Sequence, residues 1–154
     1  MTPAMRGLHR PDAMELRLHE SIDEIPAAEW DALPAADGSP VGDPFVSHAF
    51  LSGLEREGCL LPRYGWTPRH ASLHLDGRLV AAAPGYLKTN SHGEFVFDHA
   101  WAHAFARAGE TYFPKWLVAV PYTPVTGPRL LAVDGRARAA LARALVALRR
   151  RHGS

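Results

Sequence analysis

The chain is poor in cysteine and has no long apolar run. Cys59 is its one cysteine, so no disulfide can form within the chain, which is typical of a reducing compartment. No apolar stretch approaches the roughly 20 residues of a membrane span, and the N-terminus lacks the apolar core of a secretory signal. We therefore predict a cytoplasmic protein without a transmembrane segment.

The sequence also lacks the common signatures of nucleic-acid binding, nucleotide binding and serine hydrolysis. Its formal net charge is +1, and its basic residues are dispersed except for residues 149–151, so we predict no DNA partner. Neither of the two glycine-rich phosphate-binding patterns occurs, and no serine lies in a G-x-S-x-G elbow. These absences argue against phosphate-binding-loop nucleotidases and α/β-hydrolases.

A metal site is not predicted either. His99 and His103 lie one helical turn apart, a spacing that can bind zinc on one face of a helix. In zinc metalloproteases a glutamate follows the first histidine, whereas Ala100 stands there in this chain. No cysteine cluster supplies further ligands, so polar or partly buried histidines are the simpler interpretation.

The length of 154 residues suits one domain with a real core. Residues 1–13 show no periodicity and are predicted to form a disordered tail, so the folded domain comprises residues 14–154. Residues 14–19 alternate apolar and polar side chains, the period of a half-buried strand. Asp76-Gly77 predicts a tight hairpin turn, and Pro84-Gly85 predicts a break in the second strand of that hairpin. The complete pattern predicts helices at 26–33, 47–57, 99–108 and 136–151, and further strands at 69–75, 78–88 and 129–133. Residues 94–97 are either a short strand or an extended approach to the third helix.

Local signals mark the ends of these helices. Pro34 is predicted to stop the first helix, and Ser47 is predicted to cap the second. Asp98 is placed to cap the third helix, whose apolar stripe includes Trp101 and Phe105.

The rest of the predicted fold depends on residues 115–120. They form a short apolar segment without a polar face, bracketed by Pro114 and Pro121, which is typical of a central strand buried on both sides. Residues 121–128 follow as a stiff loop with three prolines. A rigid loop at the end of a central strand is a usual place for a ligand in open α/β sheets. The alternative is that this loop only connects two elements and binds no ligand.

Three segments together resemble a bacterial protein family. They are PFVSHAFLSGLE at 44–55, GEFVFDHAWAHAFARAG at 93–109 and YFPKWLVAVPYTPVTGPRLL at 112–131. In this order they are similar to the FemAB-like peptidoglycan biosynthesis/recognition group of the GNAT acyltransferase superfamily. The resemblance implies the α/β (α+β) class, with a GNAT-like mixed sheet flanked by helices. It also implies transfer of an acyl or aminoacyl group from acyl-CoA or aminoacyl-tRNA to an amine, on a small molecule or a peptidoglycan precursor, without a metal.

Members of that group are typically more than twice as long, so the resemblance implies an incomplete N-terminal part of the domain. An acyltransferase would then need the missing part. The alternative is a truncated fragment or a non-catalytic binding or assembly module without the acyl-donor site. In either case an unpaired apolar edge at residues 115–120 would favour self-association.

Candidate site residues follow from the resemblance, position by position. Asp98 would orient or deprotonate the amine, because an amine must lose its proton to attack an acyl group. Arg129 would bind a carboxylate or phosphate. Each candidate also has a structural alternative, such as a helix cap for Asp98 or a core position for Trp101. The set comprises Asp98 and Tyr122 as catalytic residues, and Trp101, Tyr112, Thr123, Thr126 and Arg129 as substrate-binding residues.

Overall fold

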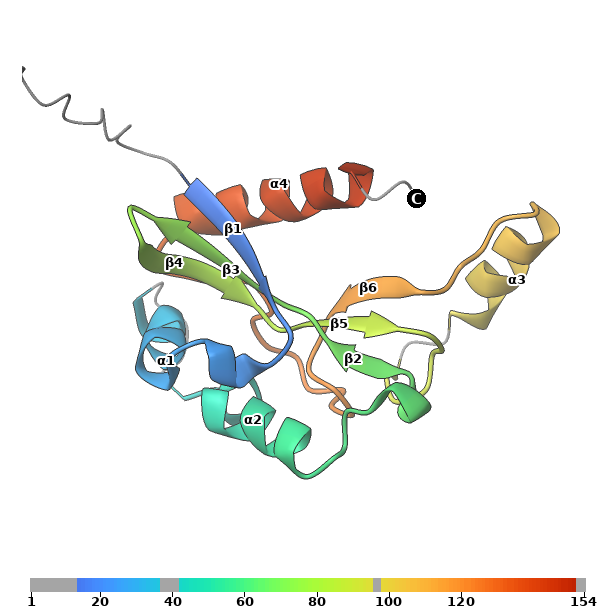
Figure 1. The fold of residues 1–154 in the computed structure, drawn as a ribbon, viewed down its shortest axis with the longest axis horizontal. Helices are drawn as coiled ribbons and strands as arrows, with labels where there is room; N and C mark the ends of the chain where they lie inside the picture. The colour runs from blue at the N-terminus through green and yellow to red at the C-terminus, as the bar shows by residue number, and fades with distance from the viewer. Residues whose placement is uncertain (1–13, 37–41, 96–97, 152–154) are drawn as a thin grey trace, which may run out of the picture.

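The computed structural model describes residues 14–36, 42–95 and 98–151, which form two antiparallel sheets and the helices around them (Figure 1). The predicted α+β class is confirmed. Every described strand pairing is antiparallel, so these residues contain no parallel pair of the kind that a GNAT-like mixed sheet would include.

The large sheet has the order β1-β3-β4-β7. Its strands are β1 (Met14–His19), β3 (His70–Leu75), β4 (Arg78–Ala83) and β7 (Leu131–Ala132). The predicted hairpin is confirmed: β3 and β4 pair directly, and Asp76 and Gly77 between them both have positive φ, as a tight hairpin turn requires. The predicted first strand is also confirmed as β1, which pairs with β3 along its whole length.

The predicted break at Pro84-Gly85 is confirmed, and there the chain passes from one sheet to the other. The small sheet has the order β2-β5-β6, with β2 at Trp66–Pro68, β5 at Gly85–Lys88 and β6 at Lys115–Val118. Gly85 lies directly against the Arg69 carbonyl and the indole of Trp116, where a Cβ atom would clash with both. Glycine is therefore required by close packing at the point where the sheets part.

The prediction of a central strand at residues 115–120 is wrong. Within the described residues β6 pairs only with β5, so it is an edge strand, and its side chains are half-buried. Its two faces contact different apolar clusters, Trp116 and Val118 in one and Leu117 in the other. Both faces are therefore apolar, which explains why the sequence resembles a central strand although the strand has one neighbour.

Helices cover both faces of the large sheet (Figure 1). Helix α4 (Gly135–Arg151) packs Ala137 and Leu141 against one face. Helix α1 (Ala27–Ala36) and helix α2 (His48–Arg56) cover the other face, with Trp30 and Leu51 fully buried. Short 3-10 turns at Ile22–Glu24, Pro44–Val46 and Pro62–Tyr64 connect the elements.

The predicted helix ends are partly confirmed. Ser47 caps α2, and its side chain accepts a hydrogen bond from the Phe50 amide. Pro34 does not stop α1, which continues to Ala36. A proline this near the end of a helix removes one backbone hydrogen bond. This loss of stability is small compared with the gain from burying Leu33. Asp134 precedes α4 and caps it, because its carboxylate accepts a hydrogen bond from the Ala137 amide.

Helix α3 (His99–Arg107) projects away from both sheets (Figure 1). Its apolar stripe is largely uncovered, because Trp101 is 66% exposed and Phe105 39%, so the structural alternative of a core position for Trp101 is excluded. Of the two alternatives for residues 94–97, the strand is absent where the chain is described, because residues 94–95 lie in a bend. Residues 96–97 lie outside the described residues.

Candidate functional site

Two lysines face each other at one end of the small sheet. Lys88 ends β5 and Lys115 begins β6, and the two are direct partners in the antiparallel register. Like charges placed opposite each other destabilise a sheet unless other groups compensate them. The segment after β5 supplies that compensation, because it carries the nearly buried carboxylates of Glu94 and Asp98.

Lys115 joins these two carboxylates. Its Nζ donates to Glu94 Oε2 at 2.7 Å and to Asp98 Oδ2. Asp98 also accepts from the hydroxyls of Ser91 and Tyr112, the latter at 2.7 Å. We call Lys88, Glu94, Asp98, Tyr112 and Lys115 the charged cluster.

The surroundings of Asp98 keep it ionised. Burial acts to raise the pKa of this carboxyl, but hydrogen bonds from Lys115, Ser91 and Tyr112 outweigh burial and hold the pKa well below its usual range. Its position before α3 is that of a cap, yet its side chain makes no capping hydrogen bond. The prediction that the Asp98 side chain caps α3 is therefore wrong, because its carboxylate accepts hydrogen bonds within the charged cluster instead.

Lys88 is the unusual member of the charged cluster because no part of it reaches solvent. Its Nζ donates to the His92 carbonyl at 2.9 Å and lies 3.7 Å from the ring centroid of Trp66. Burial lowers the pKa of Lys88 to about 8, against the opposing influence of Glu94. Hydrogen bonds from Lys115 to Asp98 and Glu94 outweigh burial and raise the pKa of Lys115. Neighbouring groups with opposite pKa shifts are characteristic of functional sites.

Replacing Lys88 with methionine is expected to stabilise the fold. A lysine whose folded pKa is below its unfolded value of about 10.4 binds fewer protons when folded, so wild-type stability should rise as pH increases from about 8 to 10. Lys88→Met should remove this rise and increase the free energy of unfolding at pH 7 by about 1–3 kcal/mol. Urea unfolding at several pH values measures both effects, and an unchanged pH slope in the variant would contradict the assignment.

Tyr122 is a second neighbour of the Trp66 ring. Its ring packs on Trp66 with centroids 5.6 Å apart, and its hydroxyl donates to the Cys59 carbonyl at 3.0 Å. Its amide donates to the Gly93 carbonyl, and a Cβ atom on Gly93 would clash with the tyrosine ring. The backbone of Tyr122 has φ +57, which is a costly conformation for a bulky residue. Strained conformations of this kind cluster at functional sites. Burial raises the pKa of its hydroxyl.

An exposed aromatic surface adjoins the charged cluster. Trp101 and Phe105 lie one helical turn apart on α3, and the Phe105 ring packs edge-on against Tyr112 at 5.3 Å. The same Tyr112 donates to Asp98, so the aromatic surface leads directly to the buried carboxylate. We call Trp101, Phe105 and Tyr112 the aromatic surface.

The structure brings some of the predicted site residues together and separates others. Asp98 and Tyr112 belong to the charged cluster, Trp101 belongs to the adjoining aromatic surface, and Tyr122 packs on Trp66. The remaining three, Thr123, Thr126 and Arg129, lie on the loop of residues 121–129. Thr123 donates to the Pro121 carbonyl, and Arg129 donates to the carbonyls of Val125 and Pro128. Thr126 is exposed.

Sequence reasoning missed Lys88, Glu94, Lys115 and Trp66. A lysine at the end of each of two apolar strands is the signal that could have identified the pair. The pairing register that makes them neighbours is not readable from one sequence.

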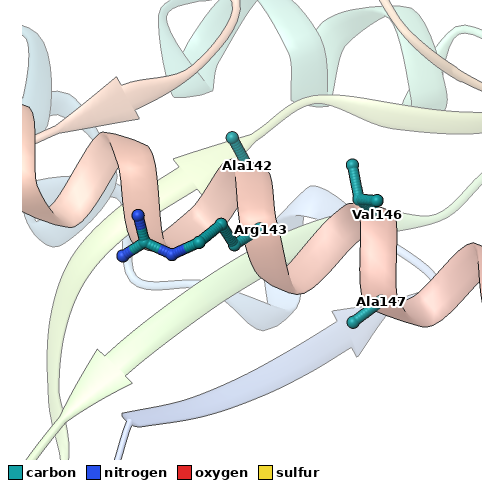
Figure 2. Close-up of a pocket in the computed structure, with 4 residues that line it drawn as sticks. All are labelled: Ala142, Arg143, Val146 and Ala147. Atoms are coloured by element: carbon teal, nitrogen blue, oxygen red, sulfur yellow. The ribbon is translucent and has the colours of Figure 1, made fainter.

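A shallow hollow on α4 offers little chemistry by comparison (Figure 2). It is lined by Ala142, Arg143, Val146 and Ala147, all from one helix. Arg143 is the one charged group among these four, and none of them is an acid or a nucleophile. The charged cluster therefore remains the candidate site.

In the described part of the chain, no three histidine, cysteine, aspartate or glutamate side chains are grouped so that they could hold a metal ion. Across the same residues, no helix combines the length and apolar character needed to cross a membrane.

Comparison with known proteins places these residues in a family context. The FemAB-like family model, described as peptidoglycan biosynthesis/recognition, matches residues 21–153. This span contains the whole charged cluster and the aromatic surface. Neither the curated proteins nor the solved structures yielded a match.

Proposed function

Because the chain belongs to the FemAB-like family, we propose that it is an N-acyltransferase of peptidoglycan biosynthesis, in which the charged cluster and the aromatic surface bind the amine acceptor. The observation that carries this proposal is the charged cluster beside the aromatic surface. A fully buried lysine, an ionised buried aspartate and a 66%-exposed tryptophan lie within one short stretch of the fold. Such polarised groups under an exposed aromatic face suit a ligand that is partly apolar and partly charged.

The residues have distinct roles in this proposal. Trp101 packs against the acceptor, and Tyr112 continues that surface toward Asp98. Asp98 orients the attacking amine through the hydrogen-bond network rather than removing its proton, because its low pKa makes it a weak base. Tyr122 holds Gly93 and Trp66 in place from the neighbouring loop, which makes it a positioning residue.

The reaction follows the chemistry of acyl transfer. The neutral amine of the acceptor attacks the acyl carbonyl and a C–N bond forms. The bond from the carbonyl carbon to the sulfur or oxygen of the carrier breaks, and the proton lost by the amine ends on the released thiol or hydroxyl. The proposed carriers are acyl-CoA and aminoacyl-tRNA, both cytoplasmic molecules. The loop at 121–129, with Thr123, Thr126 and Arg129, is the proposed donor side.

Calorimetric titration of the chain tests this proposal. The probes are acetyl-CoA, alanyl-tRNA and a UDP-linked muramyl pentapeptide. We expect saturable binding of the muramyl peptide that weakens about tenfold in Trp101→Ala, since an exposed aromatic anchor contributes on the order of 1–2 kcal/mol. Val146→Ala is the matched control, because Val146 is also an exposed apolar helix residue, 56% exposed on α4. Flat titrations with all three probes would overturn the proposal.

A second candidate is a module that binds the precursor without turnover. The burial of Asp98 favours this candidate, because the carboxylate is 4% exposed and already accepts hydrogen bonds from three side chains, so little of it is available to a substrate. Mass spectrometry of the muramyl peptide after incubation with each donor separates the two. A mass gain of one acyl group supports the transferase, whereas binding of the peptide without a mass gain supports the module.

A further inference from the structure

A continuous chain of polar side chains crosses from β1 to β3 in the large sheet, away from the charged cluster. Ser72 Oγ lies 2.7 Å from His19 Nε2 and 3.0 Å from His74 Nε2. His19 Nδ1 lies 3.3 Å from Glu24 Oε2. The capping box of the Ile22–Glu24 turn holds this glutamate in place, because its other oxygen accepts from the amides of Glu20 and Ser21.

The hydrogen-bond direction along this chain follows from the carboxylate. An ionised Glu24 can only accept, so the proton of neutral His19 is on Nδ1 and its Nε2 is bare. The Ser72 hydroxyl therefore donates to His19, and Ser72 Oγ accepts from the Nε2–H of His74. His74 Nδ1 is then a bare acceptor, and the structure buries it without a hydrogen-bond partner among the described residues.

This order of groups resembles a serine–histidine–carboxylate triad, but burial argues against a nucleophile. Ser72 has no exposed surface, and His74 is 9% exposed. A substrate could not reach the hydroxyl without removal of β1. The chain of groups does, however, join β1 to β3, and β1 has no second neighbouring strand in the described structure.

We propose that Glu24, His19, Ser72 and His74 form a proton-sensitive latch that fastens the edge strand β1 to the large sheet. At neutral pH each bond in the latch has one donor and one acceptor. A proton added to His19 Nε2 reverses the chain: Ser72 must then donate to His74 Nε2, and the proton of His74 moves to Nδ1. The latch then contains a buried N–H donor without a partner and a largely buried positive charge, both of which are costly.

Other charged groups around the latch modulate this effect without replacing it. Glu15 lies opposite His74 in the register, and Arg17 lies opposite Ser72 and is paired with Glu15. His70, opposite His19, donates through Nε2 to Glu55 on α2 and accepts the Gly85 amide through Nδ1. The charged groups linked to the latch by strand register or through His70 are Glu15, Arg17, His70 and Glu55. Glu20, Asp23 and Arg69 are next to these residues in the chain, and their side chains pair elsewhere, Arg69 with Glu20 and Asp23 with Ser52 and Arg56.

The sign of the pH effect follows from His19. Burial lowers the pKa of this imidazole, and the opposing influence of Glu24 does not restore it. A histidine with a lowered folded pKa binds fewer protons in the folded state. Its contribution to stability is therefore complete above the unfolded pKa of about 6.5 and is lost as the pH falls below that value.

Amide hydrogen exchange of the full chain at pH 7.5 and pH 5.5 tests the latch. After correction for intrinsic exchange rates, we expect the protection factors of the β1 amides to fall by about tenfold at the lower pH, equivalent to about 1.4 kcal/mol. Those of α4 should change by less than about twofold, because α4 packs on the opposite face. Equal changes in β1 and α4 would overturn the proposal.

Variants separate the latch from a general acid effect. Ser72→Ala should show low β1 protection at both pH values. The double variant His19→Gln/His74→Gln keeps amide groups near both imidazole Nε2 positions but cannot titrate, so its β1 protection should not depend on pH. His103→Gln on exposed α3 is the matched control and should retain the full response. A double variant that still loses protection about tenfold would also overturn the proposal.

Discussion

Replacing Lys115 with methionine is expected to lower the free energy of unfolding by about 3–5 kcal/mol at pH 7. The change removes the cation that Glu94 and Asp98 share and leaves both carboxylates nearly buried beside each other. Lys88 does not replace it, because its Nζ is committed to the His92 carbonyl and the Trp66 ring. Urea unfolding followed by tryptophan fluorescence measures the loss.

The pH dependence of this variant should be opposite in sign to that of the wild type. In the wild type the pKa of Asp98 is lowered on folding, so its contribution to stability is present above about pH 4 and is lost at lower pH. Without Lys115, burial becomes the dominant influence and raises the pKa of Asp98. The variant should therefore recover stability as the pH falls from 7 to 5, while the wild type should not gain through this group.

Arg56→Met is the matched control for this experiment. It also removes a cation from a carboxylate, Asp23, but the arginine side chain is 70% exposed. Exposed ion pairs contribute about 1 kcal/mol or less, so the control should lose little. A loss below about 1 kcal/mol in Lys115→Met would show that the charged cluster is not buried as described.

Replacing Gly85 with alanine is the second large effect that we expect, a loss of about 3 kcal/mol. The new methyl group would meet the Arg69 carbonyl and the Trp116 indole. It would also disturb the hydrogen bond from Trp116 Nε1 to that carbonyl, which is 3.0 Å long. Because one of the clashing atoms belongs to the backbone, a rotamer change cannot relieve the contact.

Gly53→Ala provides the control for Gly85→Ala. Gly53 lies inside α2, and nothing lies within 4 Å of a Cβ atom built there. The substitution should raise the free energy of unfolding by about 0.5–1 kcal/mol, because alanine loses less backbone entropy than glycine in a helix. If the two variants lost similar amounts of stability, close packing at Gly85 would not explain the effect.

Local signals were sufficient for much of the fold. The β3–β4 hairpin, its break at Pro84-Gly85 and the cap at Ser47 each depend on residues near one another in the chain. Backbone preferences of glycine, proline and capping side chains act over a few residues, so they can be read from sequence. The predicted α4 was confirmed for the same reason, because its leucine periodicity is local.

Long-range placement was not predictable in the same way. Residues 115–120 carry the pattern of a central strand, yet β6 lies at an edge because no second strand pairs with it among the described residues. Trp101 carries the pattern of a core residue, yet α3 projects from the fold and leaves it exposed. Amphipathicity indicates which face is apolar and does not indicate what covers it.

The sequence alone determined the family, the α+β class and most local elements, because these depend on residue identity and on neighbours in the chain. It also identified Asp98, Trp101, Tyr112 and Tyr122 as candidates. Only the tertiary structure paired Lys88 with Lys115, placed Glu94 and Asp98 against them and aligned His19, Ser72 and His74. Strand register and burial decide which charges meet and how far their pKa values shift, and both are set by contacts between residues distant in the chain.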